Sequence, residues 1–161
     1  MPNYQKQKKG FGLLEALIGV ALFSVILVSM VIAFQNIAVL QKSLTARIQA
    51  EFLLEEGVEA VRSIRDTDWT TISSATADTP YYLDFDTVSK SFDLTAGKNQ
   101  IDNFYRWVEF SPVYRDGNDD IAGSGTIDSG TKKVTVSVEW LTGGASTTKQ
   151  LSAYITDIFS E

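Results

Sequence analysis

The sequence contains no cysteine and no histidine among its 161 residues. Without cysteine, the chain forms neither a disulfide framework nor a thiolate metal site. Without histidine, it lacks the commonest general base and the commonest ligand of transition metals, which excludes a Ser-His-Asp triad and a histidine-ligated zinc site. There is also no glycine-rich phosphate loop and no nucleophile elbow. These absences exclude those catalytic and zinc sites, and no cofactor is expected.

Basic residues are scarce outside the first ten positions. The chain has 14 Lys and Arg against 20 Asp and Glu, a net charge of −6. The first ten residues carry Lys6, Lys8 and Lys9 and no acidic residue. The remainder of the chain therefore has 11 basic and 20 acidic residues, a net charge of −9. An acidic body without a basic patch argues against direct binding of nucleic acid.

A long apolar run follows this basic leader. Between Ala16 and Phe34 the chain has no charge, and its only polar side chains are Ser24 and Ser29. About 20 apolar residues suffice for a helix to cross a bilayer, and a serine can bond to its own helix backbone. We expect residues 11–34 to span the membrane, and the preceding lysines to keep the N-terminus in the cytoplasm with the body outside.

Two ordinary membrane-targeting segments explain this pattern less well. A secretory signal peptide has a shorter apolar run, of about 7–15 residues, followed by a cleavage site of small residues, and residues 35–38 (Gln-Asn-Ile-Ala) fit such a site poorly. A simple signal anchor accounts for the lysines and the apolar run but gives Glu15 no role. A charge in a membrane helix costs free energy, even where the cost falls toward the helix end.

The stretch KKGFGLLEAL, residues 8–17, resembles the class III signal of the type IV pilin superfamily. A basic leader ends at Gly10, Phe11 follows, and Glu15 is the fifth residue after that glycine, at the head of the apolar run. The resemblance implies that a prepilin peptidase cuts between Gly10 and Phe11 and methylates the new amino group on Phe11. It also implies that Glu15 neutralises the amino terminus of a neighbouring subunit, since a buried charge without a partner is strongly unfavourable.

The resemblance implies a structural subunit rather than an enzyme: a prepilin of a type IV pilus or related filament. The absence of proline from the apolar segment is more typical of minor pilins or pseudopilins than of a major pilin, and the prediction is a minor pilin. Its partners would be other pilin subunits, bound through the N-terminal helix, the prepilin peptidase and the pilus assembly platform. Its location would be the cytoplasmic (inner) membrane as a single-pass protein, and then a cell-surface or periplasmic filament.

Three alternatives stay open. A pseudopilin of a type II secretion or DNA-uptake system would assemble in the same way. A bitopic membrane protein with a ligand-binding β head would instead keep residues 1–10 attached. A membrane-tethered enzyme that acts on carbohydrate would need paired carboxylates, and no recognisable motif supplies them.

From Gln35 to Asp66 the pattern becomes amphipathic, with apolar residues at steps of three or four. This second half of the helix is expected to pack its apolar stripe on a globular head, and Gly57 is its one weak point. A coiled coil is disfavoured because the heptad is not sustained. The predicted stripe comprises Ile37, Leu40, Leu44, Ile48, Phe52, Val58, Val61 and Ile64.

Residues 67–161 read as a small β-rich head, into which Trp69 is expected to tuck. In the clearest strand, Val134, Val136, Val138 and Trp140 point to one side, and Thr135, Ser137 and Glu139 to the other. A helix followed by a run of strands predicts an α+β fold, in which the helix packs on an antiparallel sheet. The resemblance implies the same arrangement, the pilin-like roll. The strands are predicted at residues 81–86, 90–95, 104–114, 132–141 and 149–159.

Residues 116–128 place oxygen-bearing side chains at alternate positions, as a calcium-binding loop does: Asp116, Asn118 and Asp120. An EF-hand has glycine at its sixth position and glutamate at its twelfth, and isoleucine stands at both positions here. An irregular calcium site that also uses Asp128 is the alternative. The prediction is a hairpin loop that is rich in Asn, Asp and Gly because its turns require them.

Overall fold

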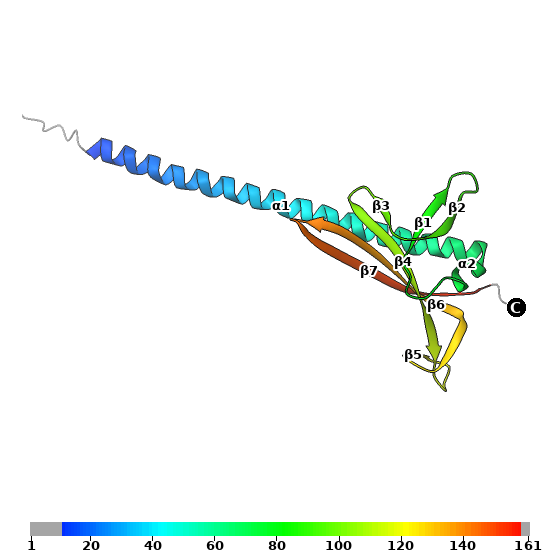
Figure 1. The fold of residues 1–161 in the computed structure, drawn as a ribbon. Helices are drawn as coiled ribbons and strands as arrows, with labels where there is room; N and C mark the ends of the chain where they lie inside the picture. The colour runs from blue at the N-terminus through cyan, green and yellow to red at the C-terminus, as the bar shows by residue number, and fades with distance from the viewer. Residues whose placement is uncertain (1–10, 159–161) are drawn as a thin grey trace, which may run out of the picture. The chain divides into compact units, whose positions relative to one another are not determined.

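A computed structural model of the chain describes residues 11–158. The predicted leader, residues 1–10, therefore lies outside the described residues, as does Phe159, the last residue of the last predicted strand. The chain divides into two compact units, Met1–Leu44 and Thr45–Glu161. A single helix, α1 (Phe11–Thr67), supplies the described part of the first unit and begins the second, and a short helix, α2 (Trp69–Ser73), follows it (Figure 1).

The second unit contains a seven-stranded antiparallel sheet with the order β2-β1-β4-β6-β7. Two short strands, β3 and β5, pair with β4 beside this path. The strands are β1 (Tyr81–Asp86), β2 (Ser91–Ala96), β3 (Asn99–Ile101), β4 (Phe104–Arg115), β5 (Ile121–Ala122), β6 (Thr126–Thr142) and β7 (Ala145–Thr156).

The last two strands are wrongly bounded in the sequence prediction. β6 begins at Thr126 rather than at residue 132, because a register shift at Pro112/Val113 lets β4 continue pairing with residues 126–128. The connection from β6 to β7 is only Gly143-Gly144, with φ values of 59° and 87°. Two adjacent positive φ angles make a tight hairpin turn that glycine adopts without strain. β7 therefore starts at Ala145, earlier than predicted, and ends at Thr156.

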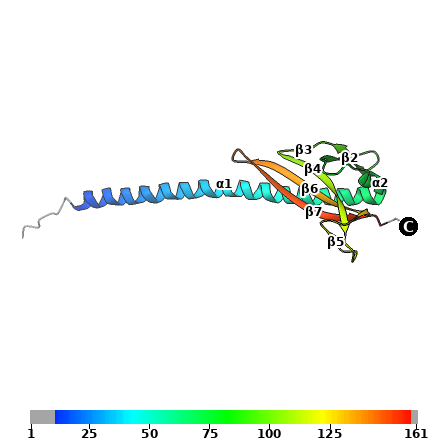
Figure 2. The same ribbon diagram turned by 60° about the horizontal axis from the view of Figure 1, so that its bottom comes forward.

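The hydrophobic core lies between the sheet and the part of α1 within the second unit (Figure 2). The prediction that one face of β6 is apolar is confirmed, since Val134, Val136 and Val138 are fully buried. Trp69 is half-buried against this core, as expected. The α+β fold with a helix packed on an antiparallel sheet is thereby confirmed. The helix contributes Ala50, Leu54, Val58, Ala60, Val61 and Ile64 to the core.

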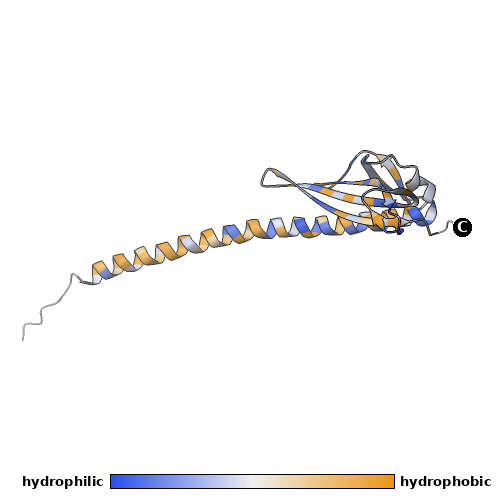
Figure 3. Cartoon of the chain, turned by 90° about the horizontal axis from the view of Figure 1, so that it is seen from below, coloured by the Kyte–Doolittle hydropathy of each residue, from blue (hydrophilic) through white to orange (hydrophobic). Residues whose placement is uncertain are grey.

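The predicted stripe along the helix is wrong at two positions of the second unit. Ile48 and Phe52 are 52% and 66% exposed, while Ala50 and Leu54 are buried. A helix advances about 100° per residue, so each four-residue step drifts by about 40° and turns the series away from the sheet. Figure 3 shows the resulting mixture of apolar and polar residues along this part of α1.

The face of the sheet opposite α1 also buries side chains. Ser137, on the side of β6 opposite the valines as predicted, is fully buried, and its Oγ accepts a hydrogen bond from Gln150 Nε2 at 3.1 Å. Trp107 pairs with Ser137 across β4 and β6 and is 8% exposed. The Lys98 ammonium lies 3.7 Å from the centroid of the Trp107 ring, a cation–π contact that covers the indole.

Candidate functional site

The N-terminal part of α1 has an apolar surface that nothing in the described chain covers. Every side chain from Gly12 to Lys42 is exposed, including Leu13 at 76% and Phe23 at 61%. This helix is long and apolar enough to cross a membrane, and the most apolar window of it is not buried at all. A core helix of a soluble protein would be mostly buried, so this surface is suited to lipid or to other apolar helices.

The two serines in this segment do not interrupt its apolar surface. Ser24 Oγ donates a hydrogen bond to the carbonyl oxygen of Val20, and Ser29 Oγ donates one to that of Val25, each at 2.8 Å. Both hydroxyls therefore have an acceptor on their own helix, four residues back. The expectation that serine would be tolerated here by bonding to its own backbone is confirmed.

Glu15 is the only charged residue between Phe11 and Gln41. It lies in the second turn of α1, is exposed, and forms no ion pair within residues 11–158. Its neighbours Leu14 and Ile18 are exposed and apolar, at 56% and 50%. The carboxylate is thus presented on an apolar helix surface without an ion-pair partner among the described groups.

A comparison with protein-family models finds the prokaryotic N-terminal methylation motif over residues 5–32. The match encloses Gly10, Phe11 and Glu15, and it runs into the exposed apolar helix. Comparisons with curated proteins and with solved structures give no match. Lys6, Lys8, Lys9 and Gly10 lie outside the described residues, and the side chain of Phe11 is likewise not described.

The exposed apolar helix ahead of a folded head fits a protein anchored in the membrane by a single pass. The methylation motif is the type IV prepilin signal, and it supports a type IV pilin-like protein that associates with other pilin subunits and with the membrane. The same motif indicates a structural subunit rather than an enzyme.

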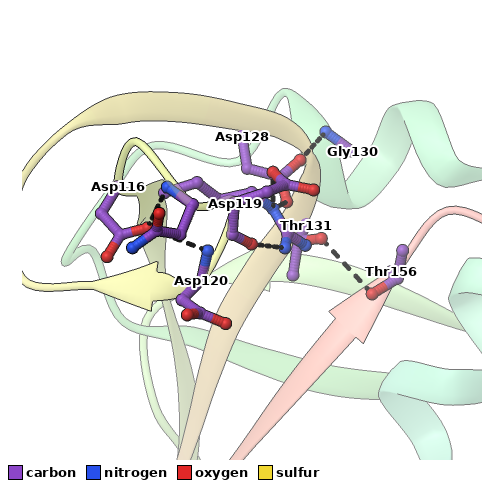
Figure 4. A network of polar contacts seen from close by, with 9 residues as sticks. Asp116, Asp119, Asp120, Asp128, Gly130, Thr131 and Thr156 are labelled. Carbon is purple, nitrogen blue, oxygen red and sulfur yellow. Dashed lines mark hydrogen bonds and ion pairs between the residues drawn. The ribbon is translucent and has the colours of Figure 1, made fainter.

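The head loop proposed for calcium uses its carboxylates to hold its own backbone (Figure 4). Asp116 Oδ1 accepts hydrogen bonds from the backbone N–H groups of Asn118 at 2.8 Å and Asp120 at 3.1 Å. No group of three or more His, Cys, Asp or Glu that could hold a metal occurs in the part of the chain that the structure describes. The calcium hypothesis therefore gains no support from the geometry, which resembles an ordinary turn.

Asp128 is held by Arg115, a pair that the sequence reasoning missed. Arg115 Nε donates to Asp128 Oδ2 at 2.7 Å, and the backbone N–H of Gly130 donates to Asp128 Oδ1 at 2.9 Å. The Arg115 hydrogen bond, helped by one from the Thr131 hydroxyl, lowers the pKa of Asp128 below its ordinary value. Arg115 Nη1 also donates to the carbonyl oxygen of Asp119 at 2.7 Å, so one guanidinium joins both ends of the hairpin. The bulge in β4 and β6 sets this pairing, and nothing in the local sequence reveals it.

Proposed function

We propose that the chain is a prepilin, a minor pilin of a type IV pilus or related filament. Residues 1–10 are a leader that is removed, residues 11–34 anchor the protein in the membrane and later enter the filament core, residues 35–66 continue the helix, and residues 67–161 form the head. The observation that carries the proposal is the methylation motif, placed on an apolar helix whose described side chains are exposed.

The proposed processing gives Glu15 a physical role. A cut between Gly10 and Phe11 leaves an ammonium group at the start of α1, which is methylated on the nitrogen. When apolar helices pack in a water-poor filament core, this charge is costly unless an opposite charge lies close by. Glu15 carries the only charge on the apolar part of α1. We assign it as the partner of the amino terminus of a neighbouring subunit.

The charge distribution supports an orientation for the precursor. Lys6, Lys8 and Lys9 precede the apolar segment, and positive residues favour the cytoplasmic side. The acidic head would then lie outside the cytoplasmic membrane. The peptidase would meet Gly10 and Phe11 at the cytoplasmic face, and the assembly platform would extract the processed chain into a cell-surface or periplasmic filament.

The second candidate is a pseudopilin of a type II secretion or DNA-uptake system. The lack of proline from Phe11 to Asp66 fits it as well as it fits a minor pilin, because both would pack an uninterrupted helix. The two differ in the partners of the head. A bitopic protein with a ligand-binding head shares the membrane segment but would not be cut.

The deciding experiment is intact-mass analysis and N-terminal sequencing of the protein isolated from membranes or filaments. We expect a chain that begins at N-methylated Phe11. The matched control is the same protein from cells that lack prepilin peptidase, which should retain residues 1–10. A chain that keeps Lys8, Lys9 and Gly10 in cells with active peptidase would reject the proposal and favour the bitopic protein.

A further inference from the structure

A cleft of about 500 Å³ opens in the head where β1 and β3 share one side of β4. β1 meets β4 only at the Tyr81–Val108 pair, and β3 pairs with Phe104, Tyr105 and Arg106. Beyond Tyr81, β1 therefore stays paired with β2 but diverges from β4, and a gap without strand pairing separates it from β3. The cleft is lined by Glu56, Leu83, Asp84, Phe85, Phe92, Asn99 and Arg106.

Two unpaired strand edges border this gap. Among the strands of residues 11–158, nothing pairs with β1 after Tyr81 on the side away from β2. Nothing in the same set pairs with β3 on the side away from β4. Free edges present N–H and C=O groups that an added strand can pair with, and an extended peptide is the usual ligand of such an edge.

Arg106 forms part of the cleft and has a donor without an acceptor. Its side chain is 4% exposed, and Nη1 lies 3.3 Å from Glu56 Oε1 and 3.4 Å from the carbonyl oxygen of Leu53. Its Nε is buried and has no hydrogen-bond partner in the described structure. A guanidinium offers five N–H donors, and a buried one left unsatisfied destabilises the protein. Because Glu56 already supplies a negative charge, a neutral acceptor such as a peptide carbonyl suits the remaining donor.

The rim of the cleft is acidic and apolar. Asp84 and Asp93 stand directly opposite each other on β1 and β2, both exposed, and no ion pair of the described residues involves either of them. Like charges in that position repel each other. The next pair along the hairpin is Phe85 and Phe92, whose ring centroids are 5.0 Å apart, and Phe85 is 48% exposed. A cationic side chain next to an apolar one would match this rim.

We propose that this cleft binds an extended segment of a partner polypeptide that carries Lys or Arg beside an apolar residue. The main chain of the segment pairs with the free edges and gives a carbonyl oxygen to Arg106. Its basic side chain lies against Asp84 and Asp93, and its apolar side chain packs on Phe85. This site goes beyond the proposed function and does not depend on it, since N-terminal processing leaves the head unchanged.

The test is fluorescence anisotropy with the full chain in detergent micelles and a labelled peptide, Thr-Val-Lys-Phe-Thr, blocked at both ends. Two control peptides separate the contributions. One replaces Lys by Glu, and the other is methylated on the backbone nitrogens so that it cannot pair with a strand edge. We expect the first peptide to bind and both controls to bind at least about tenfold more weakly. The Glu peptide brings a negative charge next to Asp84 and Asp93, and the methylated peptide cannot form backbone hydrogen bonds with a strand edge.

Variants of the protein locate the site. Asp84→Asn should weaken binding of the lysine peptide by about two- to fivefold, the range of an exposed ion pair. Arg106→Lys should weaken it by about tenfold through loss of the Nε donor. Asp102→Asn, which makes the same charge change at an exposed position outside the cleft, should have no effect.

Three outcomes would overturn the proposal: no saturable binding of the lysine peptide, equal binding of the Lys and Glu peptides, or equal effects of Asp84→Asn and Asp102→Asn. Tryptophan fluorescence would report whether Arg106→Lys disturbs the fold. If it does, the comparison of Asp84→Asn with Asp102→Asn still tests the proposal, since both side chains are exposed. Correct processing at Phe11 with any of these outcomes would leave the proposed function intact.

Discussion

Gly57 of α1 lies so close to Val136 of β6 that a Cβ at Gly57 would stand 2.6 Å from Val136 Cγ1. Val136 is fully buried, and the residues around Gly57 on the helix, Leu54, Val58 and Val61, all belong to the core. Glycine inside a helix costs about 0.5–1 kcal/mol relative to alanine. Here the missing side chain lets helix and sheet approach each other, so the weak point of the helix is also a point of close packing.

Gly57→Ala should therefore destabilise the head by about 1–3 kcal/mol, because overpacking outweighs the gain in helix propensity. The measurement is urea unfolding of the full chain in mild detergent, followed by tryptophan fluorescence. All three tryptophans lie in Thr45–Glu161, so the signal reports the head.

A double-mutant cycle separates overpacking from a general loss of stability. Val136→Ala should remove much of the effect of Gly57→Ala, since it deletes the side chain that the new methyl meets. Val134→Ala is the matched control, also fully buried on β6 but not among the closest neighbours of Gly57. Equal effects of Gly57→Ala in all three backgrounds would contradict the close-approach explanation.

Gly125 should tolerate no side chain. Its φ is 146°, and a Cβ there would lie 2.1 Å from the carbonyl oxygen of Arg115. Gly125→Ala should cost about 1–3 kcal/mol in the same unfolding experiment, because both the strained backbone and the backbone clash oppose it. Gly123→Ala is the control, since nothing lies within 4 Å of its Cβ position. Similar stabilities of the two variants would show that the hairpin relaxes easily.

Asp128 should make the head sensitive to acid. Its pKa is lowered from 3.8 in the fold, first by the Arg115 hydrogen bond and then by the Thr131 hydroxyl. A carboxyl whose folded pKa is lower than its unfolded pKa contributes stability that is present above the unfolded value and is lost as pH falls toward the folded one. The loss should thus begin near pH 4 and deepen below it. Asp128→Asn should lower the stability at pH 7 and flatten this acid dependence.

Urea unfolding at a series of pH values checks this prediction. Asp102→Asn is the control, because Asp102 is exposed and forms no ion pair in the described part of the head. A pH dependence as steep in Asp128→Asn as in the unchanged protein would show that other carboxylates cause the acid loss.

Glu15→Ala should insert into the membrane normally and be incorporated into filaments poorly. Insertion depends on the apolar run, whereas assembly, under our proposal, needs the carboxylate to meet a neighbouring amino terminus. Quantitative immunoblotting of membrane and sheared filament fractions measures both steps. Glu59→Ala is a matched control, since it removes an exposed glutamate that pairs with Arg62 in the second unit. Normal incorporation of Glu15→Ala would mean that this subunit does not need the charge pair.

Much of the architecture was predictable because its signals are local. The apolar run and the alternation in Val134–Val138 are patterns of consecutive residues, so the existence of the helix and of the clearest strand followed directly, although the bounds of that strand did not. The faces of α1 were harder. Ile48 and Phe52 fit the apolar periodicity as well as Val58 and Val61 do, but the sheet covers only one side of the helix.

The sequence by itself determined the methylation motif and the apolar run, since both depend on the order and type of consecutive residues from the basic leader to Phe34. Only the tertiary structure decided the rest. The Gly57–Val136 contact, the Arg115–Asp128 pair and the cleft beside Arg106 each join residues far apart in the chain. Such contacts depend on strand register and on how closely the helix approaches the sheet, and no local pattern encodes either.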